Sequence, residues 1–330
     1  MERNVTTKTT RIVIVGGVAG GASAAAKARR VNEQASIVMF ERGPYVSFAN
    51  CGLPYYIGGE ISDRKSLLLQ TPDTFWNRFR VKVHVLHEAT RVDRKNKRVE
   101  VRNLQTGAVF FEPYDKLILS PGAGAIVPAL PGITSPNVFT IKTVPDSDAI
   151  KAYIEKFNPR RAVVVGAGFI GLEAAEVLKR RGLDVTIVEM LPQVLPPFDA
   201  DVASFVSRFL EDKGVSLVLS DGLKSFHGNP MASEIELQSG RRLPMDMAIL
   251  SIGVRPELKL ATEAGLVIGK AGGIAVDDHQ QTSDPGIYAA GDAVEVLHLV
   301  SGQKTRIPLA GPANKPVSYT HLRAHETKAN

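Results

Sequence analysis

The distribution of apolar and polar residues predicts a strand, a turn and a helix at the start of the chain. An apolar run at 11–15 is typical of a buried parallel strand, and a glycine-rich turn at 16–21 follows it directly. The alanine-rich stretch up to about Arg30 indicates a helix. A second apolar strand, at 36–40, ends at Glu41.

The same order of elements recurs near the middle of the chain. Residues 161–165 form an apolar strand and 166–171 a glycine-rich turn. A helix to about Arg181 and a strand at 184–188 follow, and that strand ends at Glu189. Both copies therefore have the order strand, glycine turn, helix, strand and acid, which is the pattern of a dinucleotide-binding unit.

The residue types of this unit have a physical reason. Glycine permits the tight turn and lets backbone N–H groups approach a pyrophosphate, to which the helix N-terminus adds partial positive charge. The acid that ends the second strand accepts hydrogen bonds from a ribose diol. Val18 stands in the first copy where a second glycine is usual, so that copy alone is weak evidence. Together the copies predict an α/β fold with two nucleotide-binding domains.

Three further segments show a strand that leads into glycine. They lie at 117–123, 246–253 and 287–292. The last of them delivers an aspartate, Asp292, directly after Gly291.

Composition is that of an ordinary globular protein. The 330 residues are enough for two or three domains, and 44% apolar residues can fill ordinary cores. No apolar run approaches the ~18 residues of a membrane-spanning helix. Residues 1–10 are polar, lack a signal-peptide core and are expected to be disordered. The net charge of +6 fits a solvated surface as well as anionic ligands, and no basic run is interleaved with aromatic residues, which argues against nucleic acid.

Cys51, the only cysteine of the sequence, is the sharpest candidate for chemistry. Pro54 is tolerated in a helix only within the first turn, so a helix that begins here places Cys51 at its N-terminal end. That position favours the nucleophilic thiolate. The alternative is that a lone cysteine is a small buried hydrophobe. A single cysteine excludes an internal disulfide and favours a reducing, cytoplasmic location.

These motifs resemble the pyridine-nucleotide disulfide oxidoreductase superfamily, in its single-cysteine branch. Within that branch the chain is most similar to coenzyme A-disulfide reductases and NADH-dependent persulfide reductases. The resemblance extends from about Arg11 to Lys315. Its most specific parts are 16–21, 47–59, 166–176, 282–294 and 308–315.

The resemblance implies a glutathione-reductase-like fold with two Rossmann-like, three-layer domains. It assigns an FAD-binding domain to 11–151 and 267–315, and an NAD(P)H-binding domain to 152–266. The residues that it implies for FAD are Gly16, Gly17, Ala19, Gly20, Glu41, Arg42, Ser120, Pro121, Gly122, Gly291 and Asp292. Those that it implies for the nicotinamide nucleotide are Gly166, Gly168, Phe169, Ile170, Gly171, Glu189 and Gly253.

Charge favours NADH over NADPH as the electron donor. Glu189 suits a free ribose 2′-hydroxyl and would repel a 2′-phosphate, and Met190 and Leu191 follow with no arginine.

Two single-thiol chemistries remain open. In one, Cys51 forms a mixed disulfide with a small thiol such as coenzyme A. In the other, it cycles through sulfenic acid while reducing peroxide or oxygen. NADH peroxidases and oxidases of this superfamily carry a histidine in the first glycine turn, where this chain has Ala19, so the coenzyme A route is favoured. A third interpretation is an NADH-dependent electron carrier for a protein such as a rubredoxin, with Cys51 incidental.

The resemblance also implies residues that contact coenzyme A. Ser23, Lys27 and Arg30 fall on one face of the first helix, which spacing alone would equally explain as a solvated face. Family contacts to the coenzyme A arm match Ser47 and Asn50, which flank the thiol. Electrons would pass from NADH through FAD to a disulfide or persulfide on Cys51.

Two residues of the helix after the second glycine turn are candidates for contact with the nicotinamide. Phe169 is expected to gate the nicotinamide. Glu173 either lies near the nicotinamide or is a first-turn acid favoured by the helix dipole.

The end of the sequence departs from the family. Family members continue beyond Lys315 into a dimerisation domain, and some into a rhodanese domain, whereas 316–330 resembles neither. We therefore expect a truncated chain that lacks the dimerisation domain and ends in an unrelated tail, with a homodimer only for the full-length form. Disulfide reduction would then be impaired, while FAD and NADH would still bind. No metal site is expected, even at His321 and His325.

Overall fold

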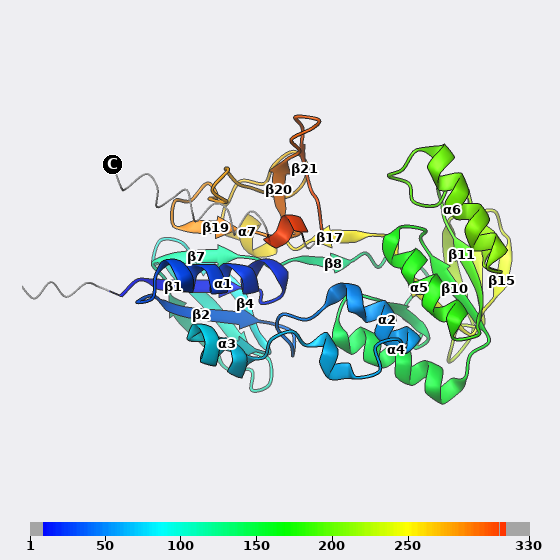
Figure 1. The fold of residues 1–330 in the computed structure, drawn as a ribbon, viewed down its shortest axis with the longest axis horizontal. Coiled ribbons are helices and arrows are strands. Elements are labelled where there is room, and N and C mark those ends of the chain that lie inside the picture. The colour runs from blue at the N-terminus through cyan, green and yellow to red at the C-terminus, as the bar shows by residue number, and fades with distance from the viewer. Residues whose placement is uncertain (1–8, 310, 315–330) are drawn as a thin grey trace, which may run out of the picture. The chain divides into compact units, whose positions relative to one another are not determined.

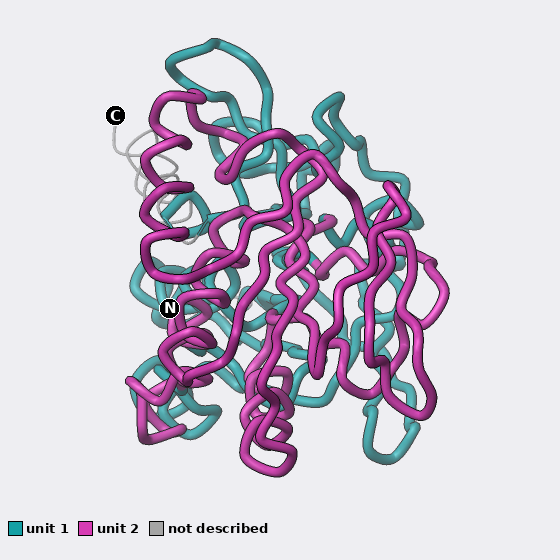
Figure 2. The backbone as a smooth tube through the Cα atoms, turned by 90° about the vertical axis from the view of Figure 1, so that its right-hand side faces the viewer, with its two compact units in different colours: residues 1–48, 68–123, 256–330 teal, residues 49–67, 124–255 magenta. Residues whose placement is uncertain are grey.

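The computed structural model of the chain describes residues 9–309 and 311–314 (Figure 1). Residues 1–8 of the predicted disordered start, and the predicted tail at 316–330, lie outside the described residues. The chain divides into two compact units (Figure 2). Unit 1 comprises Met1–Phe48, Leu68–Ala123 and Pro256–Asn330, and unit 2 comprises Ala49–Leu67 and Gly124–Arg255.

Unit 1 is built on a five-stranded parallel sheet with the strand order β19-β7-β1-β2-β3. The five strands are β1 (Arg11–Val15), β2 (Ser36–Glu41), β3 (Val81–Val85), β7 (Lys116–Leu119) and β19 (Ile287–Ala289). The apolar run of β1 is central because both of its neighbours are strands of the same sheet. A parallel strand buried on both faces requires such a run.

Helices cover one face of this sheet. They are α1 (Ala19–Val31) and α3 (Pro72–Phe79). Ile14 of β1 packs on this side with the alanines of α1 and with Phe75 of α3. The Thr71 hydroxyl accepts a hydrogen bond from the Thr74 N–H, and this capping box fixes the start of α3.

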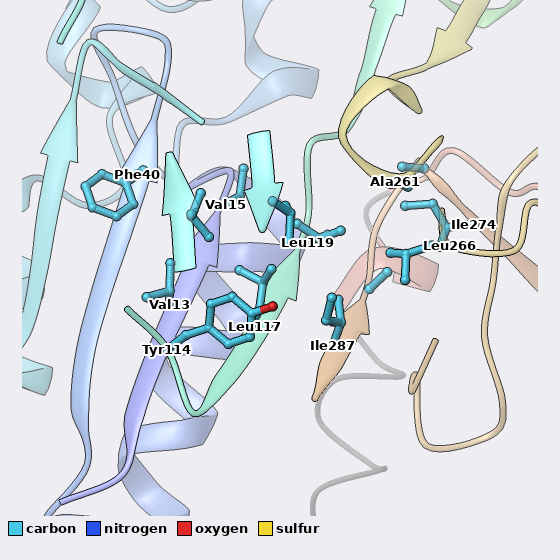
Figure 3. Packing of buried hydrophobic residues seen from close by; sticks show 14 of the residues in the cluster. Val13, Val15, Phe40, Tyr114, Leu117, Leu119, Ala261, Leu266, Ile274 and Ile287 are labelled. Carbon is cyan, nitrogen blue, oxygen red and sulfur yellow. The ribbon is translucent and has the colours of Figure 1, made fainter. Parts of the chain in front are cut away.

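Strands cover the other face. Val13 and Val15 point to this side, because side chains alternate along a strand, and they pack with Leu117 and Leu119 of β7 (Figure 3). Two small sheets and one helix pack on this side. The first sheet is β4 (His87–Asp93), β5 (Arg98–Asn103) and β6 (Val109–Pro113), and the second is β18 (Ile274–Ala275), β20 (Val294–Leu297) and β21 (Lys304–Thr305). The helix is α7 (Lys259–Glu263).

Unit 2 repeats the plan with a second five-stranded parallel sheet, in the order β12-β11-β10-β16-β9. Its strands are β9 (Val138–Thr140), β10 (Arg161–Val165), β11 (Asp184–Val188), β12 (Ser216–Val218) and β16 (Met247–Leu250). The antiparallel sheet that packs on one face is β13 (Leu223–His227), β14 (Glu234–Leu237) and β15 (Arg242–Pro244). Helices α4 (Val144–Phe157), α5 (Phe169–Arg180) and α6 (Ala200–Asp212) belong to this unit.

A short segment from earlier in the chain also belongs to unit 2. Residues Ala49–Leu67 contain the 3₁₀ turn η1 (Asn50–Gly52), the helix α2 (Leu53–Gly58) and the 3₁₀ turn η2 (Arg64–Leu67). Helix α2 packs against α4 and α5. The chain passes from unit 1 to unit 2 within β8 (Ala123–Ala125) and returns to unit 1 within β17 (Val254–Pro256). The boundaries of the two compact units thus differ from those of the predicted FAD-binding and NAD(P)H-binding domains. The assignment of those domains to their ligands stays a prediction.

The predicted strands are present, and one of them is shorter than expected. The segment 246–253 contains only β16 as strand, from Met247 to Leu250. Gly253 has a φ of +113°, which an extended strand cannot continue. Among the described residues, no helix combines the length and apolar character needed to cross a membrane.

Candidate functional site

The carboxyl ends of the parallel strands in unit 1 bring the first glycine turn together with the end of β7. The Gly16 N–H donates to the Phe40 carbonyl at 2.8 Å, and the Ser120 N–H donates to the Val15 carbonyl at 2.7 Å. Gly16 has a φ of +91°, and a Cβ there would lie 1.9 Å from the Ser120 carbonyl oxygen. Only glycine fits this position.

Glu41 holds the same turn from the end of β2. Its buried carboxylate accepts a hydrogen bond from the Gly17 N–H at 2.8 Å on Oε2 and from the Gly43 N–H at 2.7 Å on Oε1. Each carboxylate oxygen can accept a second hydrogen bond. Glu41 therefore stiffens the turn and can still accept from a ribose diol.

Glu189 makes the equivalent contacts in unit 2. Its Oε2 accepts from the Ala167 N–H at 2.7 Å, and its Oε1 accepts from the Leu191 N–H at 2.9 Å. The Gly166 N–H donates to the Val188 carbonyl at 2.8 Å, as Gly16 does to Phe40. The two halves thus share their hydrogen bonds as well as their sequence pattern.

The glycines of the second turn differ in how much space a side chain would have. A Cβ on Gly166 would lie 2.5 Å from the Ser251 carbonyl oxygen, and a Cβ on Gly171 would lie 1.9 Å from the Gly166 carbonyl oxygen. Gly168, by contrast, has no heavy atom within 4 Å of that position. The fold therefore explains Gly166 and Gly171, whereas the open space beside Gly168 suits a ligand that approaches the backbone closely.

The remaining FAD candidates gather in unit 1. Gly20 lies against the ends of two strands, because a Cβ there would be 2.6 Å from Ser120 Oγ and 3.3 Å from the Gly291 nitrogen. Arg42 is exposed and pairs with Glu257 at 3.4 Å. The other candidates of this group are Ala19, which opens α1, Pro121 and Gly122, which follow Ser120, and Asp292, which follows Gly291.

One residue that holds a glycine turn, Ser251, was not predicted from the sequence. Ser251 Oγ lies 3.0 Å from the Val165 carbonyl and 2.9 Å from the Gly166 carbonyl, so its single O–H donates to one of them or is shared between them and holds the second glycine turn. The sequence does contain a pattern that could have predicted it, because Ser251 and Gly253 repeat the spacing of Ser120 and Gly122 after a buried strand.

Exposed apolar side chains border the second turn. Phe169, the first residue of α5, is 54% exposed, and its ring meets Phe198 edge-on at 6.0 Å between centroids. Ile170 follows it, and Met190, directly after Glu189, is 64% exposed. Apolar surface beside a few fixed polar groups is typical of a nucleotide site.

Glu173 lies one turn further along α5. Burial raises the pKa of Glu173, and the charge of Glu176 adds to this. The charge of Glu173 is in turn the main reason why the pKa of Tyr55 is raised, with burial second. Glu173 is thus close enough to Tyr55 of α2 to act on it electrostatically, and its proximity to a nicotinamide stays a prediction.

The Cys51 thiol is exposed. It lies in η1, directly before α2, and Pro54 occupies the first turn of that helix as predicted. The alternative of a buried small hydrophobe is therefore wrong. On the N-terminal side, Ser47 has a φ of +46° and donates its N–H to the Gly17 carbonyl at 2.9 Å.

The coenzyme A candidates are divided between the units. Ser23, Lys27, Arg30 and Ser47 belong to unit 1, whereas Asn50 is in unit 2 with Cys51. The Ser23 hydroxyl donates to Asn314 Oδ1 at 2.8 Å. Lys27 is half-buried and Arg30 is exposed on α1. Their roles toward coenzyme A stay predictions.

The residues present fit two dinucleotides, one in each unit. Each unit supplies a buried carboxylate at the end of a strand, a glycine turn with positive φ, and a helix of at least 12 residues that begins at that turn. Across residues 9–309 and 311–314, no group of three His, Cys, Asp or Glu side chains is placed to hold a metal ion.

Comparison with known proteins agrees with this geometry. Residues 10–315 match the family described as "Pyridine nucleotide-disulphide oxidoreductase". The chain is 37% identical over 304 residues to an NADH oxidase of Methanocaldococcus jannaschii, a match that covers 92% of the chain and 67% of the relative. It is 35% identical over 308 residues to a coenzyme A disulfide reductase of Staphylococcus haemolyticus, covering 93% and 68%.

A solved structure extends the comparison. The reduced CoADR-RHD of Bacillus anthracis superposes with a TM-score of 0.94 at 47% identity over 98% of the chain. The chain spans only 58% of that protein.

Proposed function

Because the chain belongs to the pyridine nucleotide-disulphide oxidoreductase family, we propose that it is an FAD-dependent enzyme that passes electrons from NADH to a disulfide or persulfide of coenzyme A. One observation carries the proposal. Cys51 is exposed at the start of α2, and the sequence holds no second cysteine with which it could form an internal disulfide. A redox-active thiol without a second cysteine requires a sulfur partner from outside the chain.

The two glycine turns supply the cofactor sites. The N–H groups of the first turn and the Glu41 carboxylate hold the pyrophosphate and adenosine ribose of FAD, and those of the second turn and Glu189 hold NADH. FAD, when bound, accepts a hydride from NADH and passes the electron pair on to sulfur. The Cys51 thiolate attacks coenzyme A disulfide and releases one coenzyme A thiol, or it takes the outer sulfur of coenzyme A persulfide and releases coenzyme A thiol. The electron pair then cleaves the new sulfur–sulfur bond, which frees the second coenzyme A thiol or sulfide and returns Cys51 as the thiolate.

The choice of NADH follows from Glu189. Its buried carboxylate is fixed by two backbone N–H groups, so it cannot turn away from a ribose 2′-phosphate. The negative charge of Glu189 would repel the 2′-phosphate of NADPH, which NADH lacks.

The coenzyme A part of the proposal rests on the residues that the family resemblance implies for it. Lys27 and Arg30 carry the positive charge that the phosphates of coenzyme A need, and Ser23, Ser47 and Asn50 supply hydrogen-bonding groups. In the full-length protein we propose a cytoplasmic homodimer.

A second function has an observation in its favour. The M. jannaschii relative is named an NADH oxidase, which would use Cys51 as a sulfenic acid with oxygen or peroxide as the acceptor. Ala19 argues against it, since the oxidases of this superfamily resemble the chain but carry a histidine in the first turn. An NADH-dependent electron carrier, with Cys51 incidental, is the third candidate.

The deciding experiment compares acceptors with the purified, FAD-loaded chain. NADH oxidation is followed anaerobically with coenzyme A disulfide, coenzyme A persulfide or hydrogen peroxide, and separately with oxygen. We expect one of the two coenzyme A substrates to give the highest kcat/KM. Faster turnover with oxygen or peroxide would replace the proposal with the oxidase function.

A further inference from the structure

The segment that carries Cys51 is fastened to unit 2 by a small set of arginines. Helix α2 has six residues, which is too short to be stable on its own in water. Its inward side chains, among them Leu53 and Ile57, are buried. The thiol therefore stays in place only if neighbouring elements hold this helix.

Arg181 holds the far end of α2. Its Nε donates to the Ile57 carbonyl at 2.9 Å. The last carbonyls of a helix have no partner within the helix, so the guanidinium of Arg181 satisfies one of them and also complements the negative end of the helix dipole. Arg181 itself is the C-cap residue of α5, directly after its last residue, Arg180.

A second contact holds the segment beyond α2. Arg64 of η2 pairs with Asp148 of α4, with Nε 2.8 Å from Oδ1 and Nη2 2.7 Å from Oδ2. Such a two-pronged ion pair fixes direction as well as distance. Close by, the Lys151 ammonium lies 4.2 Å from the centre of the Tyr56 ring.

These contacts join the thiol to the element that begins at the second glycine turn. Helix α5 starts with Phe169, next to Gly168, and ends at Arg180; Arg181, its C-cap residue, donates to the helix that follows Cys51. We propose that Arg181 is a positioning residue for Cys51, which sets the place of the thiol by capping α2; this inference rests on the proposed function. Arg64 with Asp148 is the second anchor of the same segment.

The neighbouring arginine offers a matched control. Arg180 pairs with the exposed carboxylates of Glu60 and Glu176. Surface ion pairs of this kind contribute little to stability. Arg180→Met removes the same charge, one residue away, together with an exposed ion pair to Glu60 of the same segment, but it leaves the Ile57 carbonyl capped by Arg181.

The test uses the full chain loaded with FAD, in the variants Arg181→Met, Arg181→Lys and Arg180→Met. Three quantities are measured: the long-wavelength thiolate-to-flavin charge-transfer band, kcat with coenzyme A disulfide, and the NADH-dependent reduction of ferricyanide, which does not use the thiol. For Arg181→Met we expect the band to weaken and kcat to fall about tenfold or more, because small displacements of a reacting group have effects of this size. Ferricyanide reduction should change less than about twofold, Arg180→Met should match the wild type, and Arg181→Lys, which keeps a donor, should recover part of the loss.

Each other outcome has a defined meaning. A wild-type band and kcat in Arg181→Met would overturn the positioning role. So would an equal fall in ferricyanide reduction, because that shows general damage to the structure. A wild-type chain that shows the band but turns over oxygen or peroxide faster than either coenzyme A substrate would refute the proposed function alone, and the band in the variants would still decide the role of Arg181. Absence of the band from the wild-type chain would overturn both.

Discussion

Glu189 accepts a hydrogen bond on Oε2 from the backbone N–H of Ala167, at 2.7 Å, inside the second glycine turn. The same bond joins Glu41 to Gly17 in unit 1, at 2.8 Å. In each unit the acid therefore reaches back from the second strand to the turn after the first strand. This bond fixes the carboxylate before any nucleotide arrives, which reduces the cost of ordering the site on binding.

Replacing Glu189 with alanine should weaken discrimination between the two nicotinamide nucleotides. The variant loses the hydrogen-bond acceptor for the ribose of NADH and the charge that repels a 2′-phosphate. We expect kcat/KM for NADH to fall about tenfold and the ratio of NADH to NADPH activity to fall with it. Initial rates with both donors measure this. Glu41→Ala is the matched control, because it removes the equivalent bond in unit 1 and should lower the FAD content instead. A wild-type chain that prefers NADPH would show the assignment to be wrong.

Gly168 and Gly166 should respond oppositely to alanine. Gly168→Ala places a methyl group in open space, so the free energy of unfolding should change by less than about 1 kcal/mol while the KM for NADH rises about tenfold. Gly166→Ala forces a methyl group against the Ser251 carbonyl at a φ of +104°, and should destabilise the chain by about 2 kcal/mol or more. Denaturant unfolding and NADH titration together separate the two effects. Equal destabilisation by both changes would mean that Gly168 serves the fold.

Cys51→Ser tests the redox thiol. Serine keeps the size of the side chain but cannot form a disulfide, so turnover with coenzyme A disulfide should fall to the background rate. Ferricyanide reduction by NADH should remain, because it needs only the two nucleotide sites. The charge-transfer band should disappear in an anaerobic NADH titration. A variant that still reduces coenzyme A disulfide at the wild-type rate would favour the electron-carrier function, in which Cys51 is incidental.

Much of each nucleotide unit could be predicted because its determinants are local. A continuous apolar run such as 161–165 is typical of a strand buried on both faces, and glycine directly after it marks the turn. The positions of Glu41 and Glu189 follow from the same local order. Structure then adds why they are fixed, through bonds to Gly17 and Ala167.

The membership of the Cys51 segment in unit 2 could not be predicted in this way. It depends on contacts between residues far apart in sequence, such as Arg64 with Asp148 and Arg181 with Ile57. Long-range ion pairs leave no periodic signal in a single sequence, and arginine is common on ordinary surfaces. The early end of β16 at Leu250, before the positive φ at Gly253, could not be located either, because glycine alone does not reveal where a strand stops.

Charge reversal on α1 should weaken the coenzyme A substrate selectively. Lys27→Glu combined with Arg30→Glu replaces two cations by two anions on the face proposed to bind phosphates, so the KM for coenzyme A disulfide should rise about tenfold or more. The KM for NADH should stay the same. Lys95→Glu with Lys97→Glu makes the same change of net charge in an exposed turn of unit 1 and is the control. An unchanged KM in the α1 variant would remove coenzyme A from this helix face.

Tyr114 should make the stability of the chain fall in alkali. Its side chain is buried, and burial raises its pKa to about 12, with a smaller contribution from the charge of Asp284. The phenol of the unfolded chain ionises near 10, so between pH 10 and pH 12 the unfolded state binds fewer protons than the folded state. The free energy of unfolding is therefore unaffected by this group below pH 10 and falls as the pH rises toward 12, by up to about 2–3 kcal/mol.

Tyr114→Phe isolates this effect, because it keeps the ring and removes the ionisable hydroxyl. Urea unfolding at intervals from pH 9 to pH 12 should show a steeper loss of stability for the wild-type chain than for the variant. Other groups that ionise in alkali, such as lysines, affect both proteins alike and cancel in the difference. A difference that stays constant over this range would show that the Tyr114 phenol ionises as readily in the folded protein as in the unfolded chain.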